Sequence, residues 1–145
     1  DKRSIFISAL KRYCEIERAQ VIERVEQAGD VKQFFKDMFA SIDSVLPGEI
    51  QQYGSMTFNT MAEFGMKDAV LTELLFDHFL GITEIIADFL EQAQKAGAIS
   101  ATEDPMQLAH ILISTLQGLA TIKSMKPDYA YADAFYHVML RVINP

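Results

Sequence analysis

The sequence is poor in cysteine and tryptophan, with one Cys and no Trp in 145 residues. The single thiol, Cys14, cannot close an intramolecular disulfide, and beside seven methionines it favours a reducing, cytoplasmic setting. The alternative is an intermolecular disulfide. Residues 1–12 interleave charges with apolar residues, so they do not resemble a signal peptide and we expect no export by that route. The chain is long enough to bury a sizeable hydrophobic core as one domain without disulfides.

Basic charge is also scarce. Residues 1–30 carry equal numbers of basic and acidic side chains, so the remainder carries the whole net charge of −7. A protein that binds a polyanion needs a basic face that releases counterions. No stretch of this sequence supplies one, and we expect no binding of nucleic acid by this chain itself.

Motifs for metal binding and catalysis are missing. His78, His110 and His137 fall on different predicted helices, without the Glu-x-x-His pairs of di-iron bundles or the His-x-x-x-His spacing of zinc sites. There is neither a glycine-rich phosphate loop nor a Gly-x-Ser-x-Gly elbow. The sequence thus predicts no catalytic residue, no metal and no cofactor, and a protein that is not an enzyme. The histidines are interpreted as packed or surface residues, with pH sensing as the alternative, and Cys14 as a buried inert thiol, with redox sensing as the alternative.

Apolar residues recur at helical spacing along the whole chain, between capping residues and helix breakers. No pair of strands and no repeat is indicated. The sequence predicts an all-α single domain of about six helices, over residues 2–28, 31–46, 55–64, 68–96, 105–125 and 129–143.

The ends of these helices are marked by familiar capping residues. Asp30, Ser55, Asp68 and Asp104 are predicted N-caps, because short polar side chains accept hydrogen bonds from the first free backbone N–H groups of a helix. Residues 49–54 are predicted to form a loop. Glycines and prolines are predicted to end the helices, at Gly29, Pro47, Gly48, Gly65, Gly97 and Pro127.

The helix over 105–125 contains eighteen residues, 105–122, without a charge. A membrane-spanning helix needs about 20 mostly apolar residues, and this one includes several polar side chains, so we expect it not to span a membrane. A helix that is apolar on several sides must be covered on more than one of them. Ser114, Gly118 and Thr121 are small enough to permit close helix packing. Periodicity alone leaves two alternatives open, which are a second copy of the chain on one face or a central position within the monomer.

Aromatic and methionine residues gather near the middle of the sequence. Such side chains can line an adaptable apolar ligand cavity, and they can equally form an ordinary hydrophobic core. The sequence pattern leaves both interpretations open. The cluster comprises Phe34, Phe35, Met38, Phe39, Met56, Phe58, Met61, Phe64 and Met66.

Three segments in order resemble the C-terminal domain of TetR-family transcriptional regulators. The start "DKRSIFISALKRYCE" resembles the segment after the family's helix-turn-helix, "GSMTFNTMAEFG" resembles a stretch found in one branch, and "FLEQAQKAGAISATEDPMQLAHILISTLQGL" is similar to the family's late helices. The matching residues are Lys2, Ile5, Phe6, Ala9, Leu10, Tyr13, Gly54, Met56, Asn59, Glu63, Leu90, Ala93, Gly97, Ile99, Asp104, Pro105, Leu108, Ala109, Leu112, Leu116, Gly118 and Leu119. Ser55 replaces the branch's cysteine. The DNA-binding helices do not precede residue 1, so we expect a truncated or separated piece of a regulator.

The resemblance implies a homodimer. In the family the last two helices form a four-helix bundle with their copies, and here these would be the helices over 105–125 and 129–143. The residues implied at this seam are Ser114, Gln117, Gly118, Thr121, Phe135, Met139 and Val142.

The resemblance also implies a small apolar or aromatic effector that enters a cavity between the first five helices. Binding there would shift the first helix and so control DNA binding by the absent helix-turn-helix domain, usually as a repressor. The implied lining residues are Tyr13, Phe35, Phe39, Phe58, Met61, Phe79 and Thr115, with Asn59 and Gln117 as polar anchors. The alternative function is a helical protein-interaction or assembly module without a small ligand.

Overall fold

The computed structural model describes residues 1–44 and 54–145 of the chain. Within these ranges the chain forms six α-helices and one short 3-10 helix, without strands, which confirms the all-α prediction. The elements are α1 (Lys2–Gln27), α2 (Val31–Asp43), α3 (Met56–Phe64), η2 (Gly65–Lys67), α4 (Ala69–Lys95), α5 (Pro105–Met125) and α6 (Ala132–Ile143).

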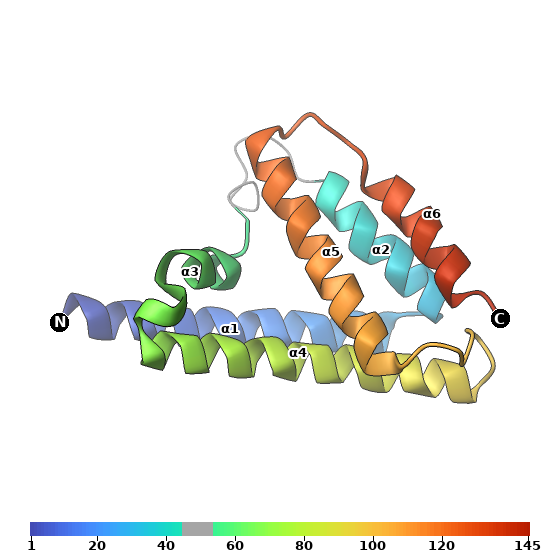
Figure 1. Cartoon of the computed structure of the whole chain (residues 1–145), viewed down its shortest axis with the longest axis horizontal. Coiled ribbons are helices and arrows are strands. Elements are labelled where there is room, and N and C mark those ends of the chain that lie inside the picture. The colour runs from blue at the N-terminus through green and yellow to red at the C-terminus, as the bar shows by residue number, and fades with distance from the viewer. Residues whose placement is uncertain (45–53) are drawn as a thin grey trace.

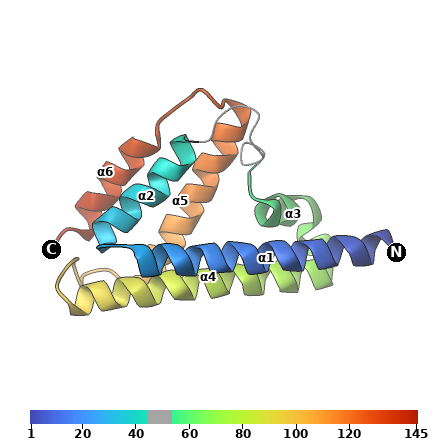
Figure 2. The ribbon, with the colours of Figure 1, turned by 180° about the vertical axis from the view of Figure 1, so that it is seen from behind.

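The two longest helices, α1 and α4, lie side by side and form the base of the molecule (Figure 1). Their N-terminal ends meet, and the Arg3 guanidinium donates to both carboxylate oxygens of Asp68 at 2.8 and 3.0 Å. Helices α2, α5 and α6 stand over the C-terminal ends of this pair, whereas α3 lies over its N-terminal half (Figure 2). The base helices therefore carry two separate groups of helices.

Two hydrophobic clusters correspond to these two groups. The main core joins α2, α4, α5 and α6 through buried residues that include Phe35, Leu90 and Leu112. A smaller second core lies between α1 and α4, where Leu10, Cys14, Leu71 and Leu75 are buried beneath α3 and η2. Because α3 packs mainly on α1 and α4, it depends on this second core for its position.

Most predicted helix starts are confirmed. The carboxylates of Asp30, Asp68 and Asp104 each accept a backbone N–H of the first turn, at 2.8, 3.1 and 2.9 Å. These bonds satisfy donors that have no partner within the helix. Ser55 occupies the N-cap position of α3, but its side chain forms no capping bond. Its hydroxyl instead donates to the Glu17 carboxylate on α1 at 3.0 Å.

Several predicted helix ends need correction. The first helix ends at Gln27 with Ala28 as an extended C-cap, so the predicted end at Gly29 comes two residues too late, and Gly29 is not among the glycines with a positive φ. Gly65 and Gly97 do adopt positive φ values of 29° and 73° and end their helices as predicted. The second helix ends at Asp43, and the predicted stop at residues 47–48 and the loop over 49–53 lie outside the described residues.

The last helix begins at Ala132, three residues later than predicted. Its N-cap residue, Tyr131, supplies no side-chain cap, and the carboxylate of Asp43 at the end of α2 takes that role. Asp43 accepts the backbone N–H groups of Tyr131 and Ala132 at 3.3 and 3.0 Å. The buried ammonium of Lys123 on α5 donates to the carbonyls of Asp43 and Tyr129 at 3.5 and 3.4 Å. The ends of α2, α5 and α6 are thus tied together by hydrogen bonds.

Replacing Asp43 with alanine is expected to lower the free energy of unfolding by about 1–2 kcal/mol, because the N–H groups of Tyr131 and Ala132 at the start of α6 lose their acceptor. Chemical denaturation of the two proteins measures the difference. Asp133→Ala is the control, since its carboxylate is exposed and lies 3.2 Å from Nε2 of His137, one turn along α6. An equal effect of both substitutions would show that the bridging cap does not stabilise α6.

No helix among residues 1–44 and 54–145 is both long and apolar enough to cross a membrane.

Candidate functional site

The structure brings together two of the aromatic residues predicted to line a cavity. Phe58 of α3 and Phe79 of α4 meet edge to face, with ring centroids 6.4 Å apart. His110 of α5 joins them, its ring centroid 5.6 Å from that of Phe79. Phe58 and Phe79 are half-buried and pack against the edge of the main core. These three rings, the aromatic cluster, lie where the two groups of helices approach each other.

The other predicted lining residues are more scattered. Phe35 and Phe39 are fully buried in the main core, where they fill space between helices. Met61 packs on the second core, and Asn59 is exposed on α3 beside Gly54. On α5 the Gln117 amide donates to the Thr121 hydroxyl at 3.3 Å, while Thr115 is half-buried on the same helix.

A polar network lies next to the aromatic cluster and was missed in the sequence. Its centre is the carboxylate of Glu17 on α1, which accepts hydrogen bonds from the hydroxyls of Ser55 and Thr57 at 3.0 and 3.2 Å. The second oxygen of this carboxylate also lies 2.8 Å from Nε2 of His78 on α4. The side chains of Glu17 and His78 are only 25% and 8% exposed. This network, the Glu17 network, joins α1, α3 and α4 through one carboxylate.

No local pattern in the sequence could have shown this network. Ser55 and Thr57 lie 38 and 40 residues after Glu17, and His78 lies 61 residues after it. Thr57 and His78 directly precede Phe58 and Phe79 in the sequence. The polar network and the aromatic cluster therefore share the same two helices and form a single candidate site with a polar and an apolar part.

Cys14 lies one turn before Glu17 and is buried in the second core. Burial, followed by the negative charge of Glu17, raises the pKa of its thiol from 9.0 to about 11. Burial and Glu17 also raise the pKa of the neighbouring Tyr13. A thiol whose ionisation is suppressed in this way is a poor nucleophile, which favours the inert interpretation of Cys14 over a sensor.

Alkaline pH is expected to destabilise the protein through Cys14. The thiol ionises near pH 9.0 in an unfolded chain but near pH 11 in the folded protein, so the stability present below pH 9 is lost between these values. Urea unfolding at pH 8 and pH 10.5 measures the loss, which should be smaller in Cys14→Ala.

At pH 7.5 the thiol of Cys14 in the folded protein should react with a thiol reagent about 100-fold more slowly than the thiol of the denatured chain. Equal rates in the two states would contradict this account.

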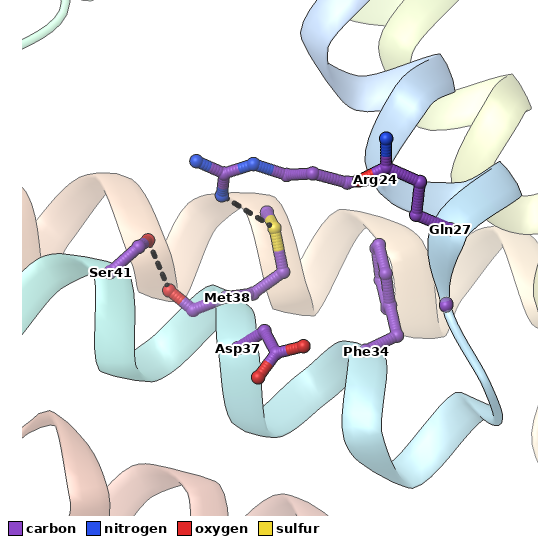
Figure 3. A pocket seen from close by; sticks show the side chains of 7 residues that line it. Arg24, Gln27, Phe34, Asp37, Met38 and Ser41 are labelled. Carbon is purple, nitrogen blue, oxygen red and sulfur yellow. Dashed lines mark hydrogen bonds between the residues drawn. The ribbon is translucent and has the colours of Figure 1, made fainter.

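A cavity of about 330 Å³ lies away from this site, between the C-terminal end of α1 and α2 (Figure 3). None of the predicted lining residues belongs to it. Its walls are formed by Arg24, Gln27, Ala28, Phe34, Asp37, Met38 and Ser41.

The predicted dimer seam falls on a surface that is apolar and open. Helices α5 and α6 both pack on α2, which leaves one side of each uncovered (Figures 1 and 2). The α5–α6 apolar face, as we call this surface, contains six large side chains between 40% and 75% exposed, which are Ile111, Ile122, Met125, Phe135, Val138 and Val142. The monomer therefore does not bury α5 on all sides.

The individual seam residues differ in their surroundings. Gly118 is exposed in line with Ile111 and Ile122, and outside its own stretch of helix no described atom lies within 4 Å of where its Cβ would be. Met139 is only 5% exposed and belongs to the main core of the chain. The polar residues Ser114, Gln117 and Thr121 follow a neighbouring stripe of α5, where Ser114 and Thr121 are exposed.

Comparison with known proteins gives the family. The family model described as "Tetracyclin repressor-like, C-terminal domain" matches residues 48–139, which is more than half of the chain. An all-α domain of this class is the ligand-binding and dimerisation part of a transcriptional regulator. The chain belongs to the tetracycline repressor-like C-terminal domain family. Searches of curated proteins and of solved structures each found no significant match.

Proposed function

We propose that this domain senses a small apolar or aromatic effector and forms a homodimer, and that it thereby controls a helix-turn-helix domain joined to the N-terminal end of α1, as a cytoplasmic repressor. The observation that carries this proposal is the meeting of Phe58, Phe79 and His110 from three helices at the boundary between the two cores. Half-buried aromatic rings from separate helices offer contact area to an apolar ligand without disturbing the main core.

The Glu17 network provides a physical link from such a ligand to α1. An effector that inserts beside Phe58 would displace α3, and Ser55 and Thr57 at the start of α3 hold the Glu17 carboxylate. A ligand changes an equilibrium between two helix arrangements only if it prefers one of them. The proposed preference is for the arrangement in which α3 has moved and Glu17 has lost its hydroxyl donors. Movement of α1 then reaches the DNA-binding domain directly.

The experiment is a thermal-shift screen of apolar and aromatic compounds, followed by titration of the best compound into variants. Binding at 100 times the dissociation constant should stabilise the folded domain by about 2.7 kcal/mol. Phe79→Ala should weaken binding by about tenfold or more, because the ring lies at the centre of the aromatic cluster. Val70→Ala on the same helix is the control, since Val70 is 53% exposed near the start of α4 and is not a member of the cluster.

Two outcomes would contradict this placement of the effector. One is a compound that binds equally well to the original domain and to Phe79→Ala, which would place the ligand elsewhere. The other is the absence of any stabilising compound together with a stable dimer, which would favour an assembly module without a small ligand. Phe79→Leu keeps the apolar volume of the position and separates a lost contact from a loss of folding.

A further inference from the structure

The cavity between α1 and α2 combines charges of both signs with an apolar floor. Its volume of about 330 Å³ is at the lower end of the range of small-ligand pockets, which is about 300–1,000 Å³. Phe34 forms part of its wall and is 2% exposed. The Phe34 ring is fixed by edge-to-face contacts with Phe35 and Phe89, at centroid distances of 6.0 and 5.1 Å. The Phe34 part of the cavity wall is therefore held in place by its aromatic neighbours.

Arg24 supplies the positive charge on the α1 side of the cavity. Its guanidinium donates to the sulfur of Met38 at 3.3 Å, as Figure 3 shows. A thioether is a weak acceptor, and a guanidinium carries five N–H donors. Arg24 forms no ion pair with any carboxylate in the described part of the chain. It retains the donors that would hold a carboxylate in a bidentate contact.

The α2 side of the cavity supplies acceptors. One carboxylate oxygen of Asp37 accepts the Gln33 amide at 2.7 Å, and no described residue donates to the other oxygen. The Ser41 hydroxyl donates to the carbonyl of Met38 at 2.7 Å, which leaves its oxygen able to accept. Both side chains project from the same helix as Met38 (Figure 3). These groups would accept hydrogen bonds from an ammonium group.

We propose that this cavity binds a small zwitterion with an apolar body, of which an apolar α-amino acid is the simplest example. The carboxylate of the ligand pairs with Arg24, its ammonium group contacts Asp37 and Ser41, and its side chain packs on Phe34 and Met38. A purely anionic ligand fits less well, because Asp37 would repel it. The cavity shares no residue with the aromatic cluster or with the Glu17 network, so this proposal stands independently of the effector site.

Titration of the isotope-labelled domain with L-leucine, L-methionine and L-phenylalanine, followed by two-dimensional NMR of the backbone amides, tests the proposal. The expected result is saturable shifts confined to residues 24–41 for at least one of them. N-acetyl-L-leucine lacks the ammonium group and L-leucinamide lacks the carboxylate, so each should bind about tenfold more weakly than leucine. An acetylated compound that binds as well as leucine would overturn the role of Asp37 and the zwitterion assignment.

Variants locate the site. Arg24→Gln and Asp37→Asn remove one charge each from exposed side chains, and each should weaken binding by about tenfold without loss of the folded spectrum. Arg12→Gln is the matched control, because Arg12 also lies exposed on α1 and pairs with Glu15, one turn along the same helix. Absence of saturable shifts with all three amino acids would overturn the proposal. Shifts that persist unchanged in Arg24→Gln would do the same.

Discussion

Replacing Phe35 with alanine is expected to lower the free energy of unfolding by about 3–5 kcal/mol. The Phe35 side chain is 0% exposed and lies in the main core, in edge-to-face contact with Phe34. Its removal loses the free energy gained by burying the ring away from water. It also leaves a cavity, because the surrounding helices cannot move far enough to fill the space. A loss of this size is a large part of the total stability of a small domain. Urea or thermal unfolding measures it.

Phe76→Ala is the matched control, because it deletes the same ring from a site that is 55% exposed. Its expected cost is below about 1 kcal/mol, as for most exposed positions. Titration of an effector into Phe35→Ala, beside its unfolding, distinguishes the two roles considered for Phe35. If Phe35 lined an open effector cavity, alanine would weaken ligand binding more than folding. A Phe35→Ala loss as small as that of Phe76→Ala would contradict its assignment to the core.

The sequence predicted the helices well because their determinants are local. Asp104 and Pro105 mark the start of α5 within four residues of the first buried leucine, and the capping bond formed as expected. The start of α6 was placed too early because its acceptor, Asp43, lies 89 residues before Ala132 in the chain. A residue that caps a helix from such a distance leaves no trace in the sequence around that helix.

The candidate site was predicted only in part, for a similar reason. Phe35, Phe39, Phe58 and Phe79 all follow helical spacing, and only the mutual orientation of the helices decides which ring enters the core. The structure places the first two inside the main core and the last two at its edge. The role of Glu17 could not be predicted, because α1 carries several acidic residues that look alike in the sequence. Glu17 differs from them only through its hydrogen-bond partners on the segment around α3 and on α4, which the fold brings close to it.

Ile122→Asp is expected to raise the dissociation constant of the proposed homodimer by about 100-fold or more. Ile122 is 43% exposed on the α5–α6 apolar face, in line with Ile111 and Gly118. In a dimer that buries this face, the substitution places a charge among apolar side chains without a partner. The monomer should remain folded, because the side chain already contacts water. Sedimentation over a dilution series measures the constant.

Two further variants make this prediction specific. Ile16→Asp introduces the same charge at an isoleucine that is also 43% exposed, but on α1, and it should leave the dimer constant unchanged. Gly118→Leu places its new Cβ in open space, where no described atom outside its own stretch of helix lies within 4 Å, so it should weaken the dimer by a clash with the second copy. If Ile16→Asp dissociates the dimer and both α5 variants do not, the subunits meet through α1. If all three variants leave the dimer intact, the α5–α6 apolar face is not the interface, and its six exposed side chains then require a different partner.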